Sequence, residues 1–164
     1  MINHLKHVLR NLEEIISGVF ISITVVVVII NVILRYFLNT GLYWAEEVAT
    51  ISFVWSVFMG ASATYKHRMN IGIDVLVNKG SEKVKRIVKL IVDILLFVIT
   101  TYIFYLSIVF TKTASIKPTA VLGISSGYVN SALLVGFGLM TLHAVRFLAE
   151  DIKSFANPIN KEEN

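Results

Sequence analysis

Two long apolar segments of this chain are joined by a short polar turn, within the sequence Asn31-Val-Ile-Leu-Arg35-Tyr-Phe-Leu-Asn-Thr-Gly41-Leu-Tyr43-Trp44-Ala-Glu46-Glu47. The turn places one arginine, an aromatic pair and two adjacent carboxylates beside charge-free segments. Charged groups are costly beside hydrocarbon, so we expect these residues to mark a membrane boundary and to need partners there. The sequence therefore predicts a helical hairpin that crosses a membrane twice.

The composition indicates a membrane protein rather than a soluble one. Of the 164 residues, 55% are hydrophobic and 16% are charged, whereas soluble domains carry about 25% charged residues. The chain has no cysteine, which excludes disulfides, zinc–thiolate sites and cysteine nucleophiles. The net charge of +4 comes from residues that flank the apolar blocks, so it fits membrane topology better than nucleic-acid binding.

Four blocks are long enough to span a bilayer, because about 20 residues at a rise of about 1.5 Å cover its ~30 Å core. We place the spans at about residues 15–36, 46–66, 88–111 and 128–148. The chain is thus predicted to be an all-α integral membrane protein with a single membrane domain, residues 1–164, and a disordered tail at about 156–164. The first span is longer than the apolar part of a signal peptide and no cleavage site follows it, so we expect it to be retained.

Lysine and arginine residues are distributed unevenly between the two sides of the predicted spans. Three of the 15 lie on one side, namely Arg35, Lys112 and Lys117, which leaves twelve on the other. Because cytoplasmic segments carry the excess of positive charge, we expect both termini to be cytoplasmic and the Arg35–Glu47 hairpin to face outward. Between spans two and three, the apolar residues around Asp74 fit a short interfacial helix.

Arg35 lies at the outer end of span one, one helical turn after Asn31. Two interpretations are open: Arg35 is an anchor whose stem reaches the lipid headgroups, or it pairs with Glu46 or Glu47 across the hairpin. Trp44 fits the aromatic belt at the same boundary. The two glutamates open span two, where the helix dipole favours negative charge by roughly 0.3–1 kcal/mol. Because they are adjacent and point about 100° apart, one partner cannot easily satisfy both.

Span two carries a ridge of small residues at a strict four-residue spacing, formed by Ser52, Ser56, Gly60 and Thr64. Residues at this spacing share one helix face, and small residues there let two helices approach closely in lipid. We interpret the ridge as a packing seam within this chain. A seam between subunits is the alternative.

Asp93 is the acidic residue that lies clearly inside a predicted span. An unpaired charge near the membrane centre costs about 2.5–3.5 kcal/mol on insertion scales. Lys89 lies four residues earlier on the same helix face, so we expect a local ion pair, with a contact to another helix as the alternative. No histidine, nucleophile or metal-ligand cluster accompanies the glutamates of the hairpin, so we expect no catalytic residue, no metal site and no cofactor.

Several motifs occur in an order that resembles one family of membrane proteins. They are Asn31-Val-Ile-Leu-Arg35-Tyr-Phe, Trp44-Ala-Glu46-Glu47, Gly60-Ala-Ser-Ala63, Ile71-Gly-Ile-Asp74-Val-Leu76 and the loop from Ala120 to Tyr128. Together they resemble the DctQ-type (SiaQ-type) small membrane subunit of tripartite ATP-independent periplasmic (TRAP) transporters, over about residues 10–150. The chain departs from the family pattern at Asn70, where members often carry histidine.

The resemblance implies a small scaffold subunit in the bacterial cytoplasmic (inner) membrane, which serves sodium-coupled uptake of organic acids of the sialic acid or C4-dicarboxylate type. It also implies the partners: a large multi-span subunit that carries substrate and sodium, a periplasmic substrate-binding protein, and membrane lipids.

In such a subunit Arg35, Trp44, Glu46 and Glu47 would fix the geometry of the hairpin, and we count Asp74 and Asp93 as further structural or interaction residues. The alternatives are an independent four-helix transporter or channel and a membrane assembly or signalling protein.

Overall fold

The computed structural model describes residues 11–67 and 82–156, and within these ranges it contains helices and one isolated bridge between Pro118 and Ser125. The helices are α2 (Leu12–Phe37), α3 (Ala45–Lys66), α5 (Glu82–Ala114) and α6 (Ser126–Ala156). Each of them is long and apolar enough to cross a membrane. The prediction of an all-α protein with four membrane-length helices is therefore confirmed.

Every helix covers the span predicted for it and extends further at one or both ends. The extension is expected, because hydropathy marks the hydrocarbon core while backbone hydrogen bonding continues into the interface. The predicted interfacial helix around Asp74 lies outside the described residues, as does all but the first residue of the predicted tail at about 156–164.

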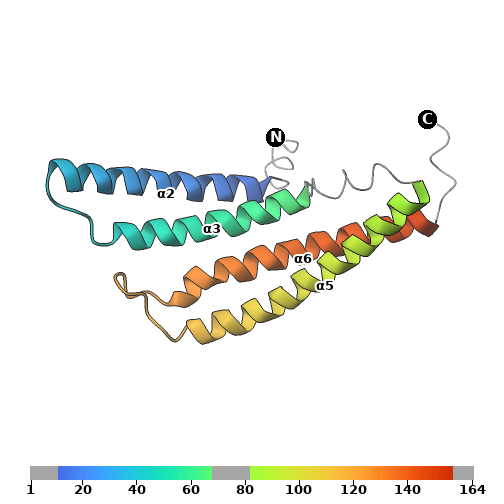
Figure 1. The fold of residues 1–164 in the computed structure, drawn as a ribbon. Coiled ribbons are helices and arrows are strands. Elements are labelled where there is room, and N and C mark those ends of the chain that lie inside the picture. Colours follow the sequence, from blue (N-terminus) through green and yellow to red (C-terminus); the bar gives the residue numbers. More distant parts are fainter. Residues whose placement is uncertain (1–10, 68–81, 157–164) are drawn as a thin grey trace, which may run out of the picture.

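The helices form two antiparallel hairpins, α2 with α3 and α5 with α6, which meet where α3 packs on α6. Figure 1 shows the resulting order α2–α3–α6–α5 as one layer with α2 and α5 as its edge helices, and α5 crosses α6 toward the end where α5 begins. The two connecting segments within the hairpins, residues 38–44 and 115–125, lie at the same end of the layer. We call this the connection end, and we call the opposite end, where α2 and α5 begin, the polar end.

Burial follows the order of the helices in the layer. In the most apolar stretch of each helix, the share of buried residues is 0% for α2 and 6% for α5. It is 39% for α3 and 28% for α6. The core lies where α3 meets α6, and there the ring of Tyr65 packs on that of Phe147 beside the buried Met140. The apolar side chains of the two edge helices, α2 and α5, are mostly exposed on the surface of the molecule.

Small residues bring the neighbouring helices together. A Cβ atom built on Gly136 of α6 would lie 2.8 Å from Cβ and 3.1 Å from the carbonyl oxygen of Phe58 on α3. Between α2 and α3, the hydroxyl of Ser17 donates a 2.9 Å hydrogen bond to the carbonyl oxygen of Ser56. The same hydroxyl oxygen would lie 2.9 Å from a Cβ built on Gly60. Both contacts depend on the absence of a larger side chain.

Candidate functional site

The small-residue ridge of α3 lies mostly inside the molecule. Ser52 and Ser56 are buried and Gly60 is half-buried, whereas Thr64 is exposed and donates a hydrogen bond to the carbonyl oxygen of Gly60. The contacts of Ser17 place α2 over the ridge at Ser56 and Gly60. These two positions are therefore used for packing within the chain, and Thr64 lies outside that contact.

Glu47 connects the two segments at the connection end. Its carboxylate accepts hydrogen bonds from the backbone N–H groups of Val121 at 2.7 Å and of Leu122 at 3.3 Å. The loop that presents these groups turns at Gly123, whose φ of 65° is the left-handed conformation that glycine adopts without strain. Hydrogen bonds to an ionised carboxylate are stronger than those between neutral groups. Glu47 therefore holds the second connecting segment against the start of α3.

Pairing of Arg35 with Glu46 or Glu47, one of the two interpretations of the sequence, is not found among the described residues. Glu47 is directed to the loop of the other hairpin instead, where two backbone N–H groups donate hydrogen bonds to it. Arg35 and Glu46 are both exposed and line a common hollow. The turn itself is held by Asn31, whose side-chain oxygen accepts a 2.8 Å hydrogen bond from the N–H of Leu42.

Trp44 takes the position that immediately precedes α3 and is half-buried. Its carbonyl oxygen accepts a 3.1 Å hydrogen bond from the N–H of Val48, which starts the hydrogen-bond ladder of the helix. Earlier in the turn, Asn39 has a φ of 52°, a left-handed conformation that asparagine tolerates better than most residues. The backbone of the turn thus sets the path from α2 to α3.

A buried cluster at the polar end joins three helices. Glu13 of α2 is 9% exposed, and its carboxylate accepts a 2.7 Å hydrogen bond from the hydroxyl of Ser62 on α3. Its other oxygen lies 2.9 Å from Nε2 of His143 on α6. The sequence patterns did not predict this cluster, because a histidine adds no formal charge to an apolar span. The lone histidine of the fourth span, His143, was the one indication in the sequence of a polar contact there. Its partner Glu13 lies 130 residues away in the chain, so spacing could not identify it.

Glu14, the neighbour of Glu13, binds the end of α3. Its carboxylate lies 2.7 Å from the ammonium of Lys66 and 2.6 Å from Nε2 of His67. Two consecutive glutamates on α2 therefore serve different neighbours, one toward the centre of the layer and one along the α2–α3 hairpin.

Lys89 forms its ion pair with Asp151 of α6, at 2.6 Å, rather than with Asp93 on its own helix. Asp151 is buried against α5, so it offers Lys89 a partner that the sequence spacing within one helix could not reveal. Asp93 is half-buried one turn further along α5. The pair joins α5 to α6 at the polar end.

Neither end contains an arrangement that suggests chemistry on a substrate. Among residues 11–67 and 82–156, no group of three or more histidine, aspartate or glutamate side chains could hold a metal ion. Asp74, a predicted interaction residue, lies outside these ranges. The buried carboxylates described above contact side chains of neighbouring helices, which is a structural arrangement.

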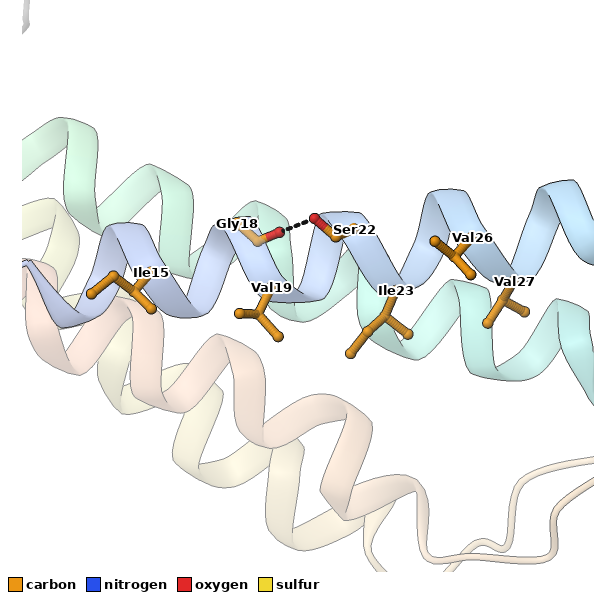
Figure 2. Close-up of a pocket in the computed structure, with 7 residues that line it drawn as sticks. All are labelled: Ile15, Gly18, Val19, Ser22, Ile23, Val26 and Val27. Carbon is orange, nitrogen blue, oxygen red and sulfur yellow. Dashed lines mark hydrogen bonds between the residues drawn. The ribbon is translucent and has the colours of Figure 1, made fainter.

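The outer face of α2 is apolar and slightly hollowed. Figure 2 shows Ile15, Val19 and Ile23 along the hollow, together with Ser22, whose hydroxyl donates a 2.7 Å hydrogen bond to the carbonyl oxygen of Gly18. Because this hydroxyl is satisfied within its own helix, the face presents mainly hydrocarbon. Such a face can contact lipid tails or another membrane helix.

The fold and its contacts can be compared with known proteins. The model of the family described as tripartite ATP-independent periplasmic transporters, DctQ component, matches residues 24–154. The C4-dicarboxylate TRAP transporter small permease protein DctQ of Vibrio cholerae is 32% identical over 81 residues, which are 49% of this chain and 35% of that protein. The sialic acid TRAP transporter small permease protein SiaQ of Vibrio cholerae is 26% identical over 132 residues, which are 80% of this chain and 76% of that protein.

A longer relative also contains a similar segment. The sialic acid TRAP transporter permease protein SiaT of Haemophilus influenzae is 28% identical over 127 residues, which are 77% of this chain and 21% of that protein. The chain thus spans about a third of the dicarboxylate relative and about a fifth of SiaT. The family match covers α3 and α5 completely, most of α6 and the second half of α2. The chain therefore belongs to the DctQ component family of TRAP transporters, which makes it a multi-pass transport component of the bacterial inner membrane and not an enzyme.

Proposed function

We propose that the chain is the small scaffold subunit of a sodium-coupled transporter for organic acids, and that it enlarges the rigid frame of a large membrane subunit. The observation that carries this proposal is the single layer of helices, whose edge helices α2 and α5 keep their apolar faces uncovered within this chain. A layer of this kind encloses no central path between its four helices, but it can extend the surface of another membrane protein.

SiaT supports a large membrane partner. The segment of SiaT that resembles this chain is about a fifth of that protein, so most of SiaT lies outside the match. We propose that the corresponding part is a separate multi-span subunit here and that it carries the substrate and the sodium ions.

The names of the relatives support an organic acid as the substrate. One relative is named for C4-dicarboxylates and two for sialic acid, and both substrates carry carboxylate groups. In this chain, Glu13, Glu14, Lys66 and Lys89 are engaged in contacts between helices. We propose that the groups that select the substrate lie in the other subunits.

The distribution of charge supports an outward orientation of the connection end. Of the lysine and arginine residues in the described ranges, Arg35, Lys112 and Lys117 lie near it, whereas the seven others lie toward the opposite ends of the helices. A periplasmic substrate-binding protein would then meet the loop that Glu47 holds, where Val121 is exposed.

The first test is purification of the tagged chain from its native membrane in a mild detergent, followed by mass spectrometry. We expect a large multi-span protein in stoichiometric amount. Recovery of the chain alone, or only with copies of itself, would contradict the proposal. Reconstituted with its partner, the chain should support organic-acid uptake that stops without a sodium gradient, and uptake by the chain alone in liposomes would show an independent transporter.

The second test identifies the edge that meets the partner. Val19 on α2 and Val98 on α5 are 52% and 59% exposed, so a tryptophan at either position changes an outer face and not the core. We expect Val19→Trp or Val98→Trp, but not both, to lower the yield of the co-purified partner, and each variant is the control for the other. If neither variant lowers the yield, the outer edges are not the interface.

A further inference from the structure

A hollow at the connection end lies between the last turn of α2 and the first turn of α3. Its volume of about 360 Å³ falls within the range of roughly 300–1,000 Å³ that is usual for small-ligand sites. Both a cation and an anion line it, Arg35 from α2 and Glu46 from α3. The hollow therefore offers opposite charges to a single ligand.

These two charges are not committed to other groups. Within the part of the chain that the structure describes, neither the guanidinium of Arg35 nor the carboxylate of Glu46 forms an ion pair or a hydrogen bond. The adjacent Glu47 differs from Glu46, because its carboxylate accepts hydrogen bonds from two backbone N–H groups. The hollow therefore presents two formal charges of opposite sign that have no partner among the described residues.

A second hollow shares Asn31, Arg35 and Glu46 with the first and extends along α2. Val28 and Val32 line this part together with Arg35 and Glu46. The two valines precede Arg35 by seven and three residues, so all three share one face of α2 over about two helical turns. At the rim, Tyr36 is 78% exposed and has the amphipathic character of residues at the headgroup level. The charged part of a ligand would thus lie at the boundary and its apolar part along α2.

We propose that this hollow binds one phosphatidylethanolamine molecule. Arg35 would donate hydrogen bonds to the lipid phosphate, for which the planar fork of a guanidinium is well suited. Glu46 would accept hydrogen bonds from the primary ammonium, and an acyl chain would lie against Val28 and Val32. An anionic phosphatidylglycerol lacks the ammonium, and the trimethylammonium of phosphatidylcholine has no N–H to donate. The pair of opposite charges therefore favours the zwitterionic lipid with a primary amine.

The test uses the full chain, reconstituted into nanodiscs that contain equal amounts of phosphatidylethanolamine, phosphatidylcholine and phosphatidylglycerol. After gentle release from the discs, native mass spectrometry counts the lipids that remain bound. We expect one retained phosphatidylethanolamine, at about tenfold higher occupancy than phosphatidylglycerol, because each lipid contact is a charge-assisted hydrogen bond. Glu46→Gln should remove the preference among the three lipids. Arg35→Gln should lower the retention of phosphatidylethanolamine by about tenfold.

Lys112→Gln is the matched control, because Lys112 is an exposed cation near the same end and does not line the hollow. It should leave lipid retention unchanged. Equal retention of the three lipids by the unaltered chain, or retention that is insensitive to both Arg35→Gln and Glu46→Gln, would overturn the proposal. A loss of partner co-purification in Arg35→Gln with unchanged lipid retention would assign the hollow to the partner subunit and would also overturn it. If Arg35→Gln fails to fold, Glu46→Gln decides alone, because only the carboxylate distinguishes the lipids by their amine.

Discussion

The two ends of the helical layer use their polar residues in different ways. At the polar end, charged side chains contact side chains of other helices: Glu13 joins three helices and Lys89 pairs with Asp151. At the connection end, Glu47 binds backbone amides of a loop, and its neighbour Glu46 has no such contact. One end therefore binds helices to each other, and the other positions a loop and keeps charge accessible.

The difference separates two uses of charge near a membrane. A buried polar group must be paired, because leaving it unsatisfied in an apolar environment is costly. An exposed charge at the boundary is under no such requirement, so it can serve a ligand or a partner. The polar end is consequently the place to look for residues that determine stability, and the connection end is the place to look for residues that determine interactions.

Both ends depend on the contact of α3 with α6, and the largest expected effect is at Gly136. In Gly136→Leu the new side chain would enter the space of Phe58, including its backbone, so the two hairpins must separate. We expect a loss near the upper limit of the ~1–3 kcal/mol that overpacking usually costs. Unfolding of the detergent-solubilised protein in a denaturing-detergent titration, followed by circular dichroism, measures it.

Gly18 provides the matched control for Gly136. A Cβ atom built on Gly18 has no neighbour within 4 Å, so Gly18→Leu should leave stability unchanged or raise it slightly. Equal losses of stability in the two variants would contradict the prediction, because they would mean that close packing at Gly136 does not determine the effect of the substitution.

The second effect tests the polar end. Glu13→Ala removes the acceptor shared by Ser62 and His143, and hydrogen bonds between membrane helices are worth up to about 1–2 kcal/mol. We expect a loss of that size in the same titration. His143→Ala and the double variant complete a double-mutant cycle. The losses should be less than additive, whereas strict additivity would show that Glu13 and His143 do not interact.

The sequence was sufficient to predict the helices. Charge-free blocks of membrane length identify the four spans. The four-residue spacing of Ser52, Ser56, Gly60 and Thr64 predicts a packing face on α3, although Thr64 itself is exposed. These features are local, since they depend on residues within one or two helical turns. The backbone must satisfy its hydrogen bonds within each span, so a long apolar block has few structures other than a helix.

The contacts between hairpins could not be predicted in the same way. Lipid tails are as apolar as the side chains, so hydropathy does not decide which helix faces which. The second hairpin supplies His143, one of the two partners of Glu13, and the loop amides at Val121 that bind Glu47. Spacing within one helix suggested Lys89 as the partner of Asp93, but the neighbouring helix supplies Asp151 to that lysine.

A smaller and more local effect is expected at the connection end. Glu47→Ala removes the acceptor for the N–H groups of Val121 and Leu122, so their hydrogen exchange should become faster while global stability changes little. Exchange measured by mass spectrometry on the peptide that contains the loop tests this. Glu46→Ala is the control and should leave the exchange unchanged. Equal acceleration by both variants would mean that the charge near the loop matters and not the hydrogen bonds of Glu47.

The smallest effect concerns an ion pair that does not join two helices. Arg146 and Glu150 lie one turn apart on α6 at 2.8 Å, and their side chains are 68% and 49% exposed. We expect Arg146→Ala to cost only about 0.3–0.5 kcal/mol, and added salt should lower that cost because dissolved ions screen an exposed pair more than a buried one. Lys89→Ala should cost more and depend less on salt, because its partner Asp151 is buried on another helix. Equal losses and equal salt dependence in the two variants would contradict this prediction. They would mean that an ion pair between two helices stabilises the protein no more than an exposed pair within one helix.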